Sequence, residues 1–168
     1  MAMKTNITYE EALEYLKHCI EAKEVSDICL RMVYIDDERA WREGIISQGI
    51  KAVDRFIEEK KSRRERVDPR TYCCKGWFYL SKGFFDESES LIQIGREWIK
   101  KALYDAPRIK NKNKVELYVY CGHGLSKYSN TLEGIITAIN CFEISQNLGN
   151  CEDLNFQILG SLYYKIFN

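Results

Sequence analysis

The stretch Asp68 to Phe85 (DPRTYCCKGWFYLSKGFF) decides the fold class of this 168-residue chain. Asp68 and Pro69 form a helix start, because aspartate caps free backbone N–H groups and proline fits the first helical turn. The residues that follow predict a helix to about Lys82 that stops at Gly83. The whole chain has only two prolines, and long proline-free stretches favour helices. The sequence therefore predicts an all-α protein.

Upstream of this stretch, the chain shows two further helix starts. Thr8 and Glu11 form a capping box, and Ile7 stands where a hydrophobic staple would. The apolar positions behind them recur at helical spacing, which predicts one buried stripe: Tyr9, Ala12, Leu13, Leu16 and Ile20. Asp36 and Asp37 are predicted to cap a long helix that reaches about Glu65. The apolar segment 25–35 fits either a helix or a strand.

Downstream, short turns separate three or four more segments. Asp86 with Glu89 predicts a helix that ends before Pro107, and the polar residues 108–114 (RIKNKNK) predict a loop. Residues 115–128 follow, with 115–121 open to either helix or strand. Asn130 with Glu133 and Asn150 with Asp153 predict the last two helices, the first ending at Gly149. The expected architecture is one domain over 1–168 with seven to eight helices, split into 8–66 and paired helices in 68–168.

Composition is that of an ordinary globular protein, with 45% hydrophobic and 30% charged residues. Lys+Arg and Asp+Glu balance at 25 each, so no net charge draws the chain toward a polyanion. No apolar run approaches the roughly 18 residues that a membrane-spanning helix needs. The seven cysteines are odd in number and no apolar signal segment precedes them, which favours free thiols in a reducing compartment. We expect a cytoplasmic protein that does not enter membranes.

Small and aromatic residues recur in the second part of the chain. Gly76, Tyr79, Gly83 and Phe85 begin the series, and residues 101–107 (KALYDAP) and 159–164 (LGSLYY) continue it. Gly122 with Leu125 and Ala138 with Phe142 mark a middle pair. This order resembles the tetratricopeptide repeat (TPR) family over residues 68–168. The spacing departs from the family, because the repeated glycines are farther apart than its repeat of about 34 residues.

The resemblance implies stacked antiparallel helix hairpins, closed by a C-terminal solvating helix. It further implies a protein or peptide partner held in the concave groove that the first helix of each pair lines. By position, the groove residues would be Arg70, Cys73, Trp77, Glu116, Val119, His123, Gln157 and Ser161. The Lys/Asn carboxylate clamp of chaperone-binding members is absent at these positions. We therefore expect a non-catalytic adaptor or regulator without a cofactor, for which self-association remains open.

A caspase-like cysteine protease is the sharpest alternative. Residues 115–124 (VELYVYCGHG) alternate in a β-prone pattern and resemble the strand and His-Gly stretch of that family. His123 would then be the general base, with Cys141 or Cys151 as the nucleophile. Cys141 lies in a helical stripe, and no apolar strand precedes Cys151. The same Gly-His-Gly with Ser126 and Lys127 faintly suggests a phosphate loop but lacks the P-loop spacing.

The basic run Lys60 to Arg66 (KKSRRER) suggests nucleic-acid binding as another alternative. Glu58, Glu59 and Glu65 dilute the run, and cations at a helix C-terminus are favoured by the helix dipole. A solvated helix end is the simpler interpretation. Metal binding is not expected, because the chain has only two histidines and no CxxC pair.

Overall fold

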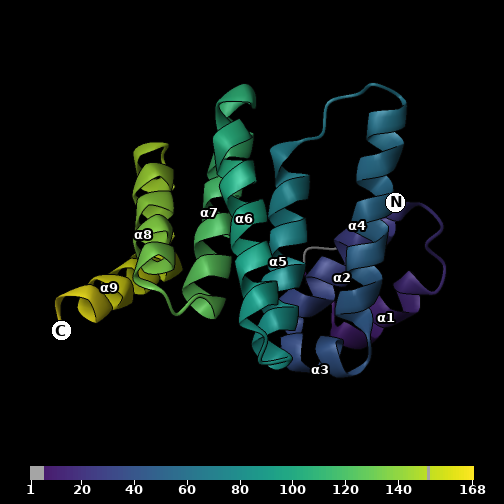
Figure 1. Ribbon diagram of the computed structural model, residues 1–168, viewed down its shortest axis with the longest axis horizontal. Helices are drawn as coiled ribbons and strands as arrows, with labels where there is room; N and C mark the ends of the chain where they lie inside the picture. Colours follow the sequence, from purple (N-terminus) through teal and green to yellow (C-terminus); the bar gives the residue numbers. More distant parts are fainter. Residues whose placement is uncertain (1–5, 151) are drawn as a thin grey trace.

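The computed structural model describes residues 6–150 and 152–168, and every regular element within them is a helix (Figure 1). The α-helices are α1 (Tyr9–Leu16), α2 (Ala22–Ile35), α3 (Asp37–Arg42), α4 (Ile45–Ser62), α5 (Pro69–Phe85), α6 (Glu89–Asp105), α7 (Asn111–Tyr128), α8 (Leu132–Asn147) and α9 (Asp153–Phe167). A short 3-10 helix, η1 (Ala106–Arg108), joins α6 to α7. The predicted all-α class is confirmed, with nine α-helices in the described part where the sequence predicted seven to eight.

The N-terminal helices start as predicted but end differently. The Thr8 hydroxyl accepts a hydrogen bond from the Glu11 backbone N–H at 3.1 Å, as a capping box requires. The chain turns after Leu16, so Ile20 lies beyond α1 and is 85% exposed, and its place in the buried stripe was wrongly predicted. Residues 25–35 belong to α2, which settles their open assignment as helix.

The predicted long helix from Asp36 to Glu65 is wrong, because the chain breaks at Gly44. Gly44 has φ +75°, a left-handed conformation that glycine adopts without steric cost. This residue ends α3 and lets α4 set off in a new direction toward Ser62.

The helix boundaries after Asp68 also differ from the predicted ones. Helix α5 continues through Gly83, where an added Cβ would lie 2.7 Å from the Ile92 backbone nitrogen. Gly83 is therefore a close contact with α6 rather than a helix stop. The side chains that cap α6 and α8 are Ser88 and Thr131 instead of Asp86 and Asn130. The predicted loop 108–114 is mostly helical, since α7 already begins at Asn111.

Neighbouring helices pack in pairs, α5 along α6 and α7 along α8, while α2 packs along α4. Figure 1 shows these long helices in a row, with α1 and α3 beside one end of α4 and α9 crossing the far end of the row. The core runs between the helices, where Phe78, Leu80, Ile99, Leu117 and Phe142 are buried. No described helix is long and apolar enough to cross a membrane.

Helix α9 has two different apolar sides. Leu159 and Leu162 are buried toward α7 and α8, whereas Phe156, Tyr164 and Phe167 are exposed. The sequence predicted a solvating helix here, but the outer surface of α9 is aromatic.

Candidate functional site

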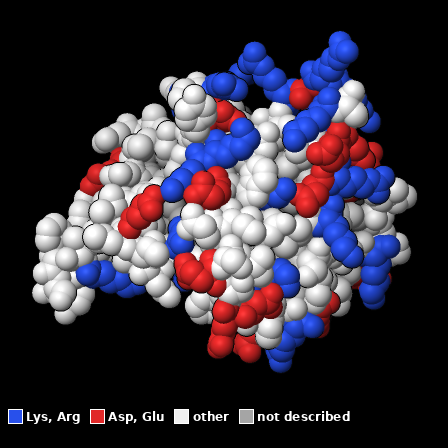
Figure 2. All heavy atoms as spheres, in the orientation of Figure 1, with Lys and Arg blue, Asp and Glu red and all other residues white. Residues whose placement is uncertain are grey.

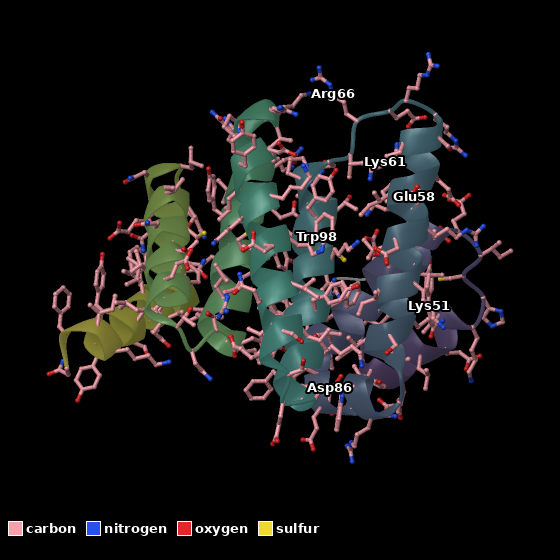
Figure 3. All side chains as sticks on the ribbon, in the orientation of Figure 1. Lys51, Glu58, Lys61, Arg66, Asp86 and Trp98 are labelled. Carbon is pink, nitrogen blue, oxygen red and sulfur yellow. The ribbon has the colours of Figure 1, made fainter. Side chains whose placement is uncertain are left out.

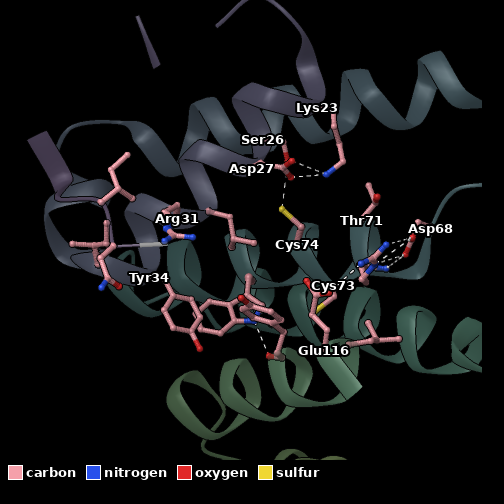
Figure 4. Close-up of a pocket in the computed structure, with 18 of the residues that line it drawn as sticks. Lys23, Ser26, Asp27, Arg31, Tyr34, Asp68, Thr71, Cys73, Cys74 and Glu116 are labelled. Atoms are coloured by element: carbon pink, nitrogen blue, oxygen red, sulfur yellow. Dashed lines mark hydrogen bonds and ion pairs between the residues drawn. The ribbon is translucent and has the colours of Figure 1, made fainter. Parts of the chain in front are cut away.

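A pocket of about 880 Å³ opens between α2, α5 and α7, and residues 6–8 border it (Figure 4). Its floor comes from α5, where Thr71, Cys73, Cys74 and Trp77 are buried. Its walls come from α2 and from the first half of α7. Since more than 30 residues separate α2 from α5 in the sequence, only the packing of the helices creates this cavity.

One end of the pocket is aromatic. Tyr34 from α2 stands between Trp77 and Tyr120, with ring centroids 5.1 Å and 5.7 Å away respectively. The Tyr34–Tyr120 pair meets edge to face, an arrangement that aromatic rings favour. Leu30, one turn before Tyr34, continues this apolar wall. Tyr34 is 42% exposed, so part of its ring faces solvent.

The Trp77 ring is held in a fixed orientation. Its Nε1–H donates to the Tyr120 carbonyl at 2.8 Å, and only 2% of the residue is exposed. A Cβ at position 124 would lie 2.9 Å from that nitrogen, so Gly124 is what allows the indole to reach the α7 backbone. The aromatic end is thus pre-formed by a link between α5 and α7.

The opposite end of the pocket is charged but internally paired. Arg70 contacts Asp68 at 2.8 Å and Glu116 at 3.0 Å, which joins the start of α5 to the start of α7. Burial opposes ionisation of Asp68, but its hydrogen bonds from Arg70 outweigh this and lower its pKa. On α2, Lys23 pairs with Asp27 at 2.6 Å. These cations and carboxylates are thus paired with one another around the pocket.

Three buried thiols, Cys74 in the pocket and Cys121 and Cys141 beyond its lining, are not suited to nucleophilic attack. Burial raises the pKa of Cys74 and of Cys141 to about 12, and it also raises the pKa of Cys121 well above its usual value. These three side chains therefore stay protonated at neutral pH, whereas a catalytic cysteine reacts as the thiolate. Cys151, the other nucleophile considered from the sequence, lies outside the described residues.

His123 connects three helices and lies outside the pocket. Its Nε2 is 2.7 Å from Asn155 Oδ1 on α9, and its Nδ1 is 2.6 Å from the Tyr34 hydroxyl on α2. An amide oxygen can only accept, so His123 Nε2 donates to Asn155 Oδ1. Asn155 is only 1% exposed, and both nitrogens of the partly buried His123 ring are engaged, so the imidazole links the three helices.

The structure brings together half of the groove residues that the sequence predicted. Those that line the pocket are Arg70, Cys73, Trp77 and Glu116. Val119 and His123 lie on α7 outside its lining, and Gln157 and Ser161 are exposed on α9.

Sequence analysis missed the contribution of α2 and the role of Asn155. The segment that carries Leu30 and Tyr34 was left open between helix and strand, so its side chains could not be assigned to a face.

The other candidate chemistries find little support in the geometry. Residues 115–124, which the protease and phosphate-loop hypotheses need outside a helix, lie within α7. Within the described ranges, no cluster of three or more His, Cys, Asp or Glu could hold a metal ion. No protein-family model, no curated protein and no solved structure matches the chain.

Proposed function

We propose that this protein is a non-catalytic, TPR-like helical module of the cytoplasm that binds a segment of a partner protein in the pocket between α2, α5 and α7. The pre-formed cavity of about 880 Å³ is the observation that carries the proposal. This volume lies within the range of about 300–1,000 Å³ typical of ligand sites. An adaptor or a regulator would use such a pocket.

The lining indicates what kind of segment would fit. Tyr34, Tyr120 and Leu30 offer an apolar wall, and aromatic residues dominate the energy of protein interfaces. The paired charges of Arg70 and Glu116 lie at the other end and can exchange hydrogen bonds with a peptide backbone. We therefore expect a short segment with one large apolar side chain next to polar groups.

Close helix contacts at glycines support the TPR-like part of the proposal. A Cβ on Gly76 would lie 2.7 Å from Ile99 of α6, and a Cβ on Gly122 would lie 2.9 Å from Phe142 of α8. Glycine and a large side chain thus meet within both helix pairs, as the resemblance implies. Gly160 differs, since an added Cβ there meets no atom within 4 Å.

A peptide-display selection on the intact chain tests this function. Leu30→Trp places a larger side chain in the pocket and should abolish binding of the selected peptides. Ile94→Trp is the matched control, because Ile94 is exposed on α6 and does not line the pocket. Peptides that bind both variants equally, or a selection that enriches none, would refute the proposal.

Self-association is a second candidate function, favoured by the outer face of α9. Phe156, Gly160, Tyr164 and Phe167 recur at helical spacing and are all exposed. Asp153 begins this helix and Lys165 lies near its end, so two antiparallel copies would bring opposite charges together. Gly160 lies near the middle of α9, where it would let the two helices approach closely.

Sedimentation of the intact chain over a range of concentrations tests this second candidate. We expect the wild-type chain to form dimers. The double variant Phe156→Glu with Tyr164→Glu should be monomeric, whereas Gln93→Glu, at an exposed position of α6, should leave the dimers intact. A chain that stays monomeric at the highest concentration would exclude the α9 contact.

A further inference from the structure

The distribution of ion pairs separates one end of the molecule from the rest. Most lysines and arginines of the described part have a carboxylate within 4.0 Å, and Arg31 has an interaction of its own. The remaining cations, which have no such partner, are Arg42, Lys51, Arg63, Arg64, Arg66, Lys110, Lys112, Lys114 and Lys165. Six of these belong to two short segments, 63–66 and 110–114.

The fold brings these two segments to the same end of the helix row. One follows the C-terminus of α4 and leads into α5, and the other leads into α7 and forms its first turn. Figure 1 shows the end of α4 and the starts of α5 and α7 at the top of the view. The ion pair of Arg70 with Glu116 at 3.0 Å ties the first turn of α5 to the second turn of α7. We call the six cations with Tyr104 the basic end.

Figure 2 shows Lys and Arg atoms gathered along this upper edge, and Figure 3 places the labelled Arg66 and Lys61 there. The acidic residues nearby are already engaged by other cations. Lys60 holds Glu65 at 2.6 Å, and Asp105 lies 3.7 Å from both Lys101 and Arg108. The six unpaired cations are therefore not neutralised, although the chain as a whole carries no net charge.

Two further features of the basic end suit a phosphate backbone that carries bases. Lys110, at the N-cap position of α7, makes no side-chain cap, so the first backbone N–H groups of α7 add partial positive charge to the same end. Tyr104, in the last turn of α6, is 81% exposed. An exposed aromatic ring beside cations is what single-stranded nucleic-acid sites use for base stacking.

We propose that the basic end binds the phosphate backbone of a single-stranded nucleic acid, with a base stacked on Tyr104. Arginine favours this ligand, because its planar guanidinium group pairs with phosphate through two hydrogen bonds. A membrane surface is less suited, because the other large exposed apolar side chains of the described part, such as Leu132 and Phe167, belong to other elements. The proposal is independent of the pocket and of its peptide.

Fluorescence anisotropy with a labelled oligo-uridylate of about 20 nucleotides tests the proposal on the intact chain. If all six cations contact phosphates, the slope of log K against log salt should approach about −4, since each contact contributes roughly −0.7 on single strands. Arg63→Ala with Arg64→Ala and Arg66→Ala should weaken binding at least tenfold and reduce the slope by roughly half. The triple change of Lys110, Lys112 and Lys114 to alanine should do the same.

The matched control removes three cations elsewhere: Arg42→Ala, Lys51→Ala and Lys165→Ala. These are also unpaired, but they lie on α3, α4 and α9, so binding should stay within about twofold of the wild type. Tyr104→Ala should lower affinity roughly tenfold at constant salt, and Tyr104→Trp should restore it. The salt slope should not change in either tyrosine variant, because no phosphate contact is lost.

Several outcomes would overturn the proposal. Absence of binding at 50 mM salt is one, and a control triple variant that loses as much affinity as the other two is another. Poly-glutamate or vesicles with phosphatidylserine that compete as well as unlabelled oligo-uridylate would show a general anion surface instead. If Tyr104→Ala bound the oligonucleotide with unchanged affinity, no base would be stacked on Tyr104, and this result would also contradict the proposal.

Discussion

Glycine at position 49 illustrates how single residues set the distance between helices. A Cβ on Gly49 of α4 would lie 2.4 Å from the Phe78 ring of α5, and Phe78 is fully buried. Because the ring is buried, it can move only by displacing its neighbours in the core. Gly160 on α9 is also helical, yet nothing lies within 4 Å of its Cβ position. The same substitution should therefore have opposite effects at these two positions.

We expect Gly49→Ala to lower the free energy of unfolding by up to about 2 kcal/mol. Overpacking costs about 1–3 kcal/mol, which exceeds the gain of about 1 kcal/mol from the helix propensity of alanine. Gly160→Ala, as the matched control, should raise stability by about 0.5–1 kcal/mol. Urea unfolding of the two variants measures both effects, and a stabilised Gly49→Ala would contradict the close contact.

Helix α9 depends on few polar links for its position. The His123 ring joins Asn155 of α9 to α7, and the Tyr34 hydroxyl holds the ring from the other side. Tyr163 of α9 also donates to Glu143 of α8. Because Asn155 is buried, its side chain cannot find water when the imidazole is removed.

His123→Ala should therefore loosen α9 before the rest of the molecule. We expect its backbone amides to exchange hydrogen roughly tenfold faster, since an unsatisfied buried group costs about 1–3 kcal/mol. Gln157→Ala, on an exposed position of α9, is the control and should leave the exchange unchanged. Equal exchange in the two variants would mean that apolar packing alone holds α9. Hydrogen exchange followed by mass spectrometry resolves the helix.

Helix α7 shows how a local pattern can mislead. Residues 115–121 are β-prone and alternate in character, which left their assignment open. Leu117, Cys121, Leu125 and Tyr128 are all buried, and their spacing of three or four residues forms one helical face. That longer period becomes clear only when residues beyond the short alternating stretch are included.

At the scale of the whole molecule, the partly buried carboxylate of Asp37 joins distant helices. Asp37 of α3 accepts a hydrogen bond from the Tyr128 hydroxyl of α7 at 2.6 Å and an ion pair from Lys127 at 3.0 Å. Burial opposes ionisation of Asp37, but these partners outweigh it, and its pKa falls below the usual 3.8. The pKa of Asp68 is lowered in the same way by Arg70.

These depressed pKa values predict that the protein loses stability in acid. A group with a lower pKa in the folded state stabilises the fold above its unfolded value, and this contribution disappears as pH falls through the folded pKa. The free energy of unfolding should therefore decrease below about pH 4. Asp37→Asn should reduce the difference between pH 7 and pH 3, whereas Asp153→Asn, exposed on α9, should not. Urea titrations at pH 7 and pH 3 measure the free energy of unfolding of the wild type and of both variants. An equal loss of this free energy between the two pH values in all three proteins would contradict the role of Asp37.

The helical class and several helix starts follow from local features of the sequence. Thr8 and Asp68 cap α1 and α5 through their own side chains, and these are interactions within three residues. An apolar stripe likewise marked α1, because helical period is a local property. Such features need no information about distant parts of the chain.

Tertiary structure alone decided where helices break and what lines the pocket. Gly83 continues α5 because α6 packs closely against it, and Gly44 separates α3 from α4 as the chain turns back. The pocket joins Tyr34 to Tyr120, and the basic end joins residues 63–66 to residues 110–114. These partners are separated by more than forty residues, and their meeting depends on the packing of whole helix pairs, which no local pattern encodes.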